Sequence, residues 1–189
     1  MTTAIDSEGW LRDAVQVPSP NHNQRPDNTP VDLLVIHNIS LPPGEFGGGH
    51  VTRFFCNDLN GAEHPYFATI ADLQVSSHLL IDRQGKVTQF VPLHARAWHA
   101  GASQFEGREN CNDFSIGIEL EGTDELPYSD EQYACLVEVT RELMAHFPGL
   151  TTERIVGHSD IAPGRKTDPG PAFDWVRYKS ALELLNQVG

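Results

Sequence analysis

Long apolar stretches are absent from this chain of 189 residues. No run approaches the roughly 20 apolar residues that a membrane-spanning helix needs, so we expect no membrane partner. The opening residues, MTTAIDSEGW, also lack the basic and apolar regions of a secretory signal. We therefore expect a soluble protein of the cytoplasm.

Basic residues are scarce. The chain has 13 Lys and Arg against 26 Asp and Glu, which gives a formal net charge of -13. Non-specific binding to nucleic acids or anionic membranes needs a basic face that neutralises phosphates, so both partner classes are disfavoured. An anionic substrate would have to be attracted by a local group of positive charges.

Cysteines are few and isolated. No C-x-x-C pair is formed by Cys56, Cys111 and Cys135, and an odd number of cysteines cannot all pair in disulfides within one chain. Isolated cysteines of this kind are typical of reduced, buried thiols. We expect all three to be structural.

The rest of the composition is that of an ordinary globular protein, with 39% hydrophobic and 21% charged residues. The length suits one domain with a sizeable core, so we expect residues 1–189 to form a single domain and a monomer. Four prolines between positions 18 and 30 indicate that residues 1–30 form an extended N-terminal arm.

Local patterns predict both strands and helices. The expected strands cover residues 31–39, 76–82, 86–91, 115–121 and 154–161, and the expected helices cover residues 51–58, 129–147 and 172–187. Gly85 permits a hairpin turn between the second and third strands, and Ser129 with Gln132 predicts a capping box. This alternation predicts an α/β fold, with one mixed β-sheet flanked by helices.

Two segments also predict which side chains are buried. Strict alternation in residues 115–121 places Glu119 on the face away from the apolar residues Ile116, Ile118 and Leu120. The expected inner face of the closing helix consists of Phe173, Val176, Ala181, Leu184 and Leu185.

Two histidines occupy comparable positions near the ends of short apolar strands. A histidine such as His37 is, taken alone, more often a satisfied core residue than a ligand. His158 lies near the end of another strand, however, and two such histidines can converge at one edge of a sheet. Asp168 follows in the loop GRKTDPGP, where Pro169 restricts the backbone. Convergence of these three side chains predicts a metal centre.

Two imidazoles and a carboxylate are the ligands of a catalytic zinc site, which leaves the fourth position open. We expect one Zn²⁺ per chain, since calcium or magnesium would require more oxygen ligands. Zinc lowers the pKa of a bound water to about 7 and polarises a carbonyl, so the expected reaction is hydrolysis.

Further side chains have alternative interpretations. Lys166, two residues before Asp168, is either an oxyanion donor beside the metal or a solvated lysine. Glu119 is either a general base or a surface carboxylate. His78 could lie behind a ligand and His99 could line a cleft, and either could replace one of the three ligands.

The chain resembles the type 2 N-acetylmuramoyl-L-alanine amidases, and within them the AmpD-type amidases of 1,6-anhydro-muropeptides. The resemblance rests on LLVIHNISLPPGEFG, HPYF, RAWHAG, CNDFSIGIELEGTD and GHSDIAPGRKTDPGPAFDW. It implies the fold of type 2 amidases and peptidoglycan-recognition proteins. The implied reaction cuts the amide between the lactyl group of 1,6-anhydro-N-acetylmuramic acid and L-alanine of the stem peptide, during cytoplasmic peptidoglycan recycling.

The resemblance also implies residue roles. His37, His158 and Asp168 match the zinc ligands, Glu119 the catalytic carboxylate and Lys166 the oxyanion-stabilising lysine. Candidate substrate-binding residues are Asn38, Tyr66, Trp98 and Arg108. Related chains often have a further arginine where this one has Asn110, so the expected clamp for a substrate carboxylate is incomplete.

Two other functions are compatible with the sequence. A muropeptide-binding module would use the metal structurally and would close its site with a fourth protein ligand. A wall-lytic amidase would act on intact peptidoglycan. The full set of metal ligands and the absence of an export signal favour the recycling enzyme.

Overall fold

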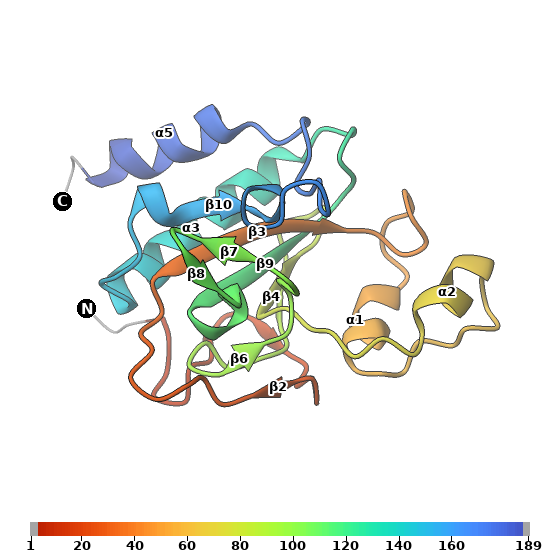
Figure 1. Cartoon of the computed structure of the whole chain (residues 1–189). Helices are drawn as coiled ribbons and strands as arrows, with labels where there is room; N and C mark the ends of the chain where they lie inside the picture. Colours follow the sequence, from red (N-terminus) through yellow and green to blue (C-terminus); the bar gives the residue numbers. More distant parts are fainter. Residues whose placement is uncertain (1–3, 187–189) are drawn as a thin grey trace.

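The computed structural model describes residues 4–186. A six-stranded sheet in the order β1-β5-β4-β9-β3-β10 forms its centre (Figure 1). The strands are β1 (Val15–Gln16), β3 (Leu33–Ile39), β4 (Leu79–Ile81), β5 (Val87–Gln89), β9 (Ser115–Glu121) and β10 (Ile155–Gly157). Neighbouring strands are parallel except β4 and β5, which form the predicted antiparallel hairpin. The expected α/β fold with a mixed sheet is confirmed.

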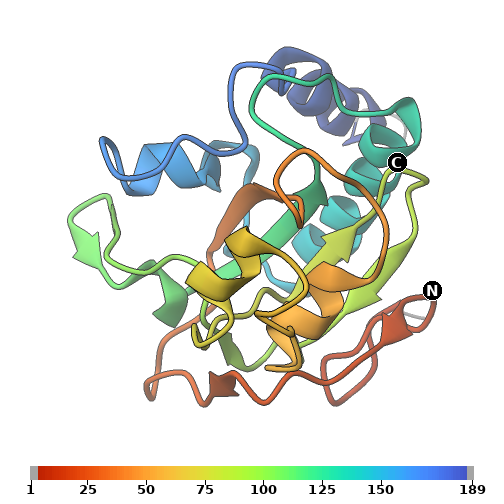
Figure 2. The same ribbon diagram turned by 90° about the vertical axis from the view of Figure 1, so that its right-hand side faces the viewer.

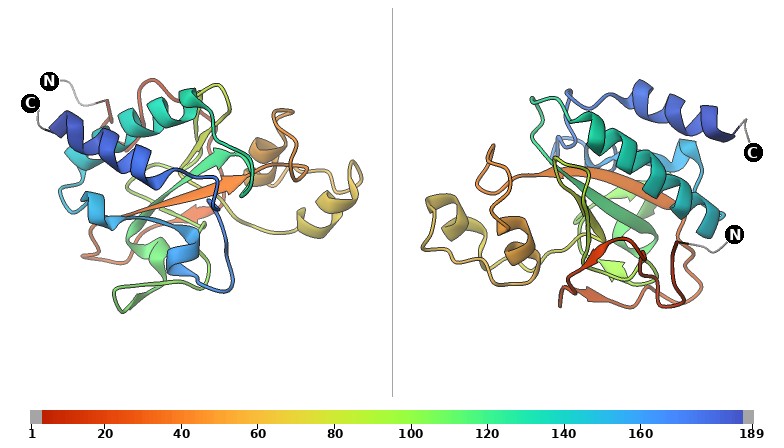
Figure 3. Two further views of the ribbon diagram at one scale, coloured as in Figure 1. Left: turned by 90° about the horizontal axis from the view of Figure 1, so that it is seen from above. Right: turned by 180° about the vertical axis from the view of Figure 1, so that it is seen from behind.

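Helices α3 (Asp130–His146) and α5 (Trp175–Asn186) lie on the same face of the sheet (Figure 3). Apolar residues of β3 and β9, including Leu34, Ile36 and Ile118, pack in the core with these helices. The opposite face of the two strands presents Leu33, Val35 and the residues in alternation with them. Both central strands are therefore covered on both faces, and of their residues only Asn38 and Ile39, at the end of β3, are partly exposed.

Helix α3 begins where the capping box was predicted. The Ser129 hydroxyl accepts a hydrogen bond from the backbone N–H of Gln132 at 3.1 Å, and the Gln132 side chain accepts one from the backbone of Ser129 at 3.1 Å. Helix α5 begins at Trp175 rather than at residue 172, and the expected end at Gln187 lies outside the described residues.

The buried face of α5 agrees only in part with the expected one, since Phe173 and Ala181 pack in the core but Val176 and Leu184 do not. Val176 and Leu184 are 78% and 66% exposed, whereas Tyr178 and Leu182 are buried. The prediction counted Phe173 as the first inner residue, but Phe173 precedes the helix and does not set its phase. It also passed over Tyr178, whose hydroxyl pairs with Thr140 at 2.6 Å. The side chain of Leu185 lies outside the described residues.

The segment predicted as one strand at residues 154–161 divides into β10 and a short helix, α4 (His158–Ile161). The chain turns because the Asp160 carboxylate accepts a hydrogen bond from the N–H of Gly157 at 2.7 Å, which favours a helical turn. His158 therefore begins a helix instead of ending a strand.

Two small helices project beyond the end of β3. Helix α1 (His50–Phe55) is shorter than the predicted 51–58, because Asn57 adopts a left-handed conformation with φ 59°. Helix α2 (Pro65–Ile70) was not predicted, although Pro65 at its first position is a typical start signal. Figure 2 looks onto this end of the molecule and shows both helices in front of the sheet.

The remaining elements are short. Strand β2 (His22–Asn23) pairs with β6 (Arg96–Ala97), and β7 (Gln104–Phe105) pairs with β8 (Arg108–Glu109). Two turns of 3-10 helix cover Cys111–Asp113 and Thr152–Arg154. The three cysteines are free, with Cys111 buried and the other two partly exposed. None of the described helices has the length and hydropathy to cross a membrane.

Residues 4–30, the described part of the expected arm, run along the other elements with little regular structure. Ile5 and Leu11 are buried in the core. The Arg25 guanidinium donates four hydrogen bonds, of 2.9 to 3.2 Å, to backbone carbonyls of Leu93, Asn112, Asp113 and Ser115. This segment is fixed to loops that lie beneath the candidate site.

Candidate active site

Parallel pairing brings two predicted site residues side by side. His37 on β3 is in register with Glu119 on β9, and His158 follows the end of the adjacent strand β10. Paired residues of neighbouring strands point to the same side of a sheet, so His37 and Glu119 share the face away from α3 and α5. The expectation that Glu119 faces away from the apolar layer agrees with this register.

Three side chains converge at this end of the sheet. Nδ1 of His37 lies 3.0 Å from Nδ1 of His158 and 3.0 Å from Oδ2 of Asp168, and Nδ1 of His158 lies 3.1 Å from the same oxygen. The three side chains are only 2%, 5% and 15% exposed, in that order for His37, His158 and Asp168. The backbone carbonyl of Asp168 accepts a hydrogen bond from the N–H of Ser159 at 3.0 Å, which fixes the loop against α4.

The outer ring nitrogens of both histidines have partners. Nε2 of His158 lies 3.0 Å from the carbonyl oxygen of Ala100, and Nε2 of His37 lies 2.8 Å from Nδ1 of His99. Because a carbonyl only accepts, a neutral His158 has its proton on Nε2 and a lone pair on Nδ1. Burial lowers the pKa of His37 to about 4, which favours its neutral form.

The electrostatics of Asp168 favour a charged carboxylate. Burial raises its pKa, but hydrogen bonds from His158 and His37 outweigh this effect, and the net pKa lies below the usual value. Asn38 and Tyr128 hold the next residue, since both side chains donate hydrogen bonds to the carbonyl of Pro169, at 3.2 and 2.7 Å.

This donor set fits a metal ion. Ligand atoms of a tetrahedral ion at 2.0 to 2.2 Å lie about 3.3 to 3.6 Å apart, so the separations of 3.0 to 3.1 Å found here are a few tenths of an ångström shorter. Three electron-pair donors so close together are mutually repulsive unless a proton or cation lies between them. Among the residues that the structure describes, no fourth His, Cys, Asp or Glu joins the cluster.

Glu119 is buried beside the cluster. Burial, together with the nearby Asp168, raises the pKa of its carboxyl well above the usual value, while Lys166 opposes the shift. Its Oε2 is inaccessible to solvent and has no hydrogen-bond partner within residues 4–186. Lys166 itself is exposed and lines the same cavity. The structure thus brings together all five residues expected to carry the chemistry.

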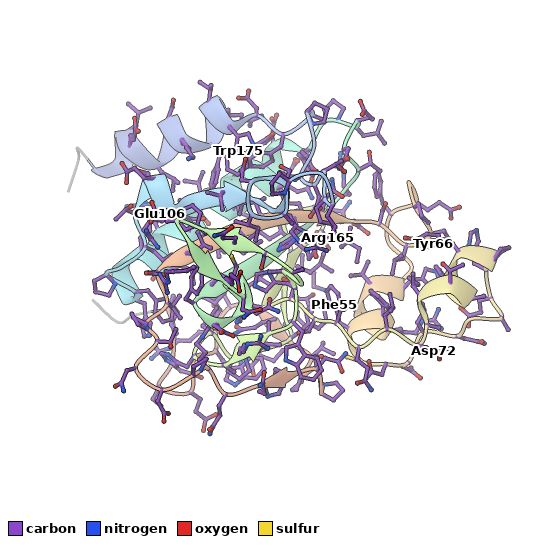
Figure 4. The ribbon with its side chains drawn as sticks, viewed as in Figure 1. Phe55, Tyr66, Asp72, Glu106, Arg165 and Trp175 are labelled. Atoms are coloured by element: carbon purple, nitrogen blue, oxygen red, sulfur yellow. The ribbon has the colours of Figure 1, made fainter. Side chains whose placement is uncertain are left out.

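The cavity above the cluster has a volume of about 610 Å³. Its lining includes the charged residues Glu119, Asp124, Arg165 and Lys166 and the apolar or aromatic residues Phe54, Phe55, Tyr66, Ile70, Leu73 and Trp98. Figure 4 shows Arg165 near the sheet and Tyr66 on α2 across from it. The lining therefore offers apolar surface together with both positive and negative charge.

Three of the four expected substrate-binding residues, Asn38, Tyr66 and Trp98, line this cavity. Arg108 does not. Its guanidinium pairs with Asp32 at 2.7 Å and lies 3.6 Å from the ring centre of Phe114. Arg165 is the arginine that lines the cavity. Its position next to Lys166 is the signal by which the sequence could have revealed it.

Of the two further histidines, His99 lines the cavity beside His37, as the sequence suggested, and His78 is fully buried. His99 contacts the outer nitrogen of His37, and burial lowers its pKa well below the ordinary value. His78 accepts a hydrogen bond from the N–H of Gly117 at 3.1 Å, and its other nitrogen lies 3.0 Å from the carbonyl of Ala95. Neither residue belongs to the group of three converging donors.

Known proteins share both sequence and fold with this chain. The family model described as N-acetylmuramoyl-L-alanine amidase matches residues 27–171. The 1,6-anhydro-N-acetylmuramyl-L-alanine amidase AmpD of Escherichia coli is 57% identical over 172 residues, which cover 91% of this chain and 93% of that protein. AmpD of Haemophilus influenzae is 53% identical, over 93% of this chain and 96% of the relative.

Solved structures agree. A crystal structure of a selenomethionine derivative of AmpD superimposes with a TM-score of 0.91 at 54% identity, covering 94% of this chain and 98% of that one. AmiD of Escherichia coli, in complex with anhydro-N-acetylmuramic acid linked to a tripeptide, gives 0.59 at 28% identity, covering 94% of this chain and 65% of AmiD. The chain therefore belongs to the N-acetylmuramoyl-L-alanine amidase family, among its AmpD-type members.

Proposed function

We propose that this protein is a zinc amidase that hydrolyses the bond between the lactyl group of 1,6-anhydro-N-acetylmuramic acid and L-alanine of the stem peptide. The observation that carries the proposal is the convergence of His37, His158 and Asp168 next to the unpartnered carboxylate of Glu119. Two imidazole nitrogens and one carboxylate oxygen, with no fourth ligand among the described residues, are typical of a catalytic zinc site.

The cavity suits such a substrate. Its volume of about 610 Å³ lies within the range of small-molecule sites. The aromatic rings of Tyr66 and Trp98 offer flat apolar surfaces to a sugar ring, and Arg165 with Lys166 offers positive charge to carboxylates of a stem peptide. Related amidases with 28% and 27% identity have been solved with anhydro-muropeptides, which supports this class of ligand.

Zinc held by the three donors would supply a Lewis acid that polarises the lactyl carbonyl. Glu119 accepts a proton from the attacking water while the water oxygen bonds to the carbonyl carbon. The Lys166 ammonium donates a hydrogen bond to the oxyanion that forms. When the C–N bond breaks, Glu119 returns the proton to the leaving nitrogen. The products are the carboxylate of the sugar and a peptide with a free amino group.

The cellular setting is part of the same proposal. The relatives named AmpD act on 1,6-anhydro sugars, and the described helices include none that could span a membrane. We infer a monomeric enzyme of the cytoplasm that acts in peptidoglycan recycling. Cell fractionation tests the compartment, and light scattering of the purified protein tests the monomer.

The reaction is tested by incubating the purified protein with anhydro-muramyl-tripeptide and detecting products by mass spectrometry. We expect release of free tripeptide, loss of activity with a chelator, and recovery with zinc. Intact substrate under every metal condition would overturn the proposal in favour of a binding module. Clearing of purified sacculi as fast as cleavage of the soluble fragment would identify a wall-lytic amidase instead.

A further inference from the structure

The ring of His99 has a fixed position beside His37. The residue follows β6, and its backbone N–H donates a hydrogen bond to the Asn112 side chain at 3.0 Å. The ring lies directly over Gly117 on β9, where an added Cβ would be only 2.6 Å from Cγ of His99. A glycine at position 117 is therefore required for the imidazole to occupy this place.

Both nitrogens of His99 are engaged in a hydrogen-bonded chain. Nδ1 lies 2.8 Å from Nε2 of His37, and Nε2 lies 3.0 Å from the hydroxyl oxygen of Ser115. The planes of the two imidazoles are nearly perpendicular, at 89°. Ser115 is completely buried at the start of β9, so its hydroxyl is not shared with bulk water.

The hydrogen bonds that link His37, His99 and Ser115 can point in either of two directions. In the first, His37 donates its Nε2 proton to His99, and His99 donates its own Nε2 proton to Ser115, which leaves a lone pair on Nδ1 of His37. In the second, Ser115 donates to His99 and His99 donates to His37. The proton of His37 then lies on Nδ1, where it can bond to Asp168 Oδ2 at 3.0 Å but cannot leave a lone pair for a metal.

The other histidine of the cluster has no such freedom. Its outer nitrogen faces the carbonyl of Ala100, which can only accept, so the proton of His158 stays on Nε2 in every state. The two histidines thus differ in their outer partners: a fixed acceptor for His158 and a reversible imidazole for His37. This difference assigns a role to His99 that a carbonyl could not perform.

We propose that His99 is a positioning residue whose hydrogen-bonded chain, His37–His99–Ser115, sets the tautomer of His37 and reverses direction when metal binds. The proposal rests on the metal role proposed for His37. Without metal, the proton of His37 lies on Nδ1 and bridges to Asp168. With metal, it lies on Nε2 and is held by His99.

The first test measures zinc affinity by competition with a chromophoric chelator. His99→Phe keeps a flat ring over Gly117 but removes both nitrogens, and we expect zinc binding to weaken about 10- to 100-fold. His99→Asn places an amide oxygen near the position of Nδ1 and should retain most of the affinity. Equal zinc affinity of His99→Phe and the parent protein would overturn the positioning role.

Ser115→Ala removes the hydroxyl that bonds to His99 and should also weaken zinc binding. Its matched control is Ser77→Ala, which removes another buried hydroxyl that contacts the same strand, through a hydrogen bond of 2.7 Å to the carbonyl of Gly117. The control should lose stability without losing zinc affinity. An equal loss of affinity in both variants would overturn the involvement of Ser115.

The second test observes the tautomer directly by ¹⁵N NMR of the histidine rings in the otherwise native protein. We expect the His37 proton on Nδ1 without metal and on Nε2 with zinc, whereas His158 keeps its proton on Nε2. A His37 proton on Nε2 in both states would overturn the reversal. If the protein binds zinc with these shifts but cleaves no muropeptide, the proposed function fails and this inference stands. If the protein cleaves muropeptide but His99→Phe binds zinc as tightly as the parent protein, this inference fails and the proposed function stands.

Discussion

Glu119 on β9 lies directly opposite His37 on β3, in the register that also pairs Val35 with Gly117 and Leu33 with Ser115. Side chains alternate along a strand, so a slip of one residue would turn either His37 or Glu119 into the core. The buried leucines and isoleucines of the other face resist such a slip. The packing of the core therefore also sets the distance between the expected metal ligand and the expected general base.

Replacement of this carboxylate separates metal binding from catalysis. We expect Glu119→Gln to retain zinc and to lose about 10²- to 10⁴-fold in kcat, because the amide cannot accept a proton. Stability should not fall, since Oε2 has no hydrogen-bond partner to lose within the described residues. Metal analysis and steady-state kinetics on anhydro-muramyl-tripeptide provide the measurement. A variant as fast as the parent protein would exclude Glu119 as the base.

Lys166 is expected to stabilise the oxyanion that forms when water attacks the carbonyl. Lys166→Ala should lower kcat by about 10²- to 10³-fold with little change in KM, because a donor to the oxyanion matters mainly in the transition state. The side chain is exposed, so the melting temperature should not change. Lys86→Ala is the matched control, since Lys86 is also exposed but lies outside the cavity. Equal kinetics of the two variants would assign Lys166 to the solvated surface.

Replacement of the two arginines should affect substrate binding differently. Arg165 also donates hydrogen bonds of 2.6 and 2.7 Å to two backbone carbonyls, so its loss should lower stability as well. Arg165→Met is expected to raise KM about tenfold for a substrate with free stem carboxylates, because the cavity loses its arginine. Arg108→Met should leave kcat/KM unchanged and lower the free energy of unfolding by about 1 kcal/mol, through loss of the Asp32 pair and the Phe114 contact. If Arg108→Met raised KM and Arg165→Met did not, Arg108 would be the residue that binds the substrate carboxylate.

His78 should make stability depend on pH. Burial, with a further contribution from Arg25, lowers its pKa to about 3, below the model-peptide value of 6.5. Between these values the unfolded chain binds a proton at this residue and the native protein does not. The free energy of unfolding therefore falls as pH decreases through this window, by up to about 1.4 kcal/mol per pH unit for one group.

Denaturant unfolding of metal-free protein at pH 7 and at pH 5 measures this dependence. His78→Gln is the comparison, because glutamine has no titrating group in this range. We expect a smaller loss of stability between the two pH values in the variant. Equal losses would show that His78 does not contribute.

Much of the site could be predicted because its residues lie in strongly patterned segments. A short, β-branched apolar run bounded by prolines, such as the predicted strand 31–39, is typical of a strand covered on both faces, and the ends of such parallel strands meet at one edge. That reasoning brings His37 and His158 near each other, whereas the place of Glu119 opposite His37 follows from the strand register, which the sequence pattern did not settle. The predicted strand through His158 was wrong because one hydrogen bond, from Gly157 to Asp160, decides where β10 ends.

Other features depend on packing that a local pattern does not contain. The place of Arg108 outside the cavity depends on the path of the β7–β8 hairpin, which pairs this arginine with Asp32, and no local pattern indicates it. His99 stands in a loop with no periodicity, and its place beside His37 depends on a glycine on a different element. The buried face of α5 includes Tyr178, which a count of apolar residues omits.

The hydrogen bonds of Arg25 can form only after much later residues have been synthesised. This side chain meets carbonyls that come 68 to 90 residues later in the chain, the last of them on Ser115. During synthesis Arg25 is thus made well before its partners, and it cannot reach its final position until Ser115 has followed it. Contacts of such long range slow folding, because the intervening loop must close before they form.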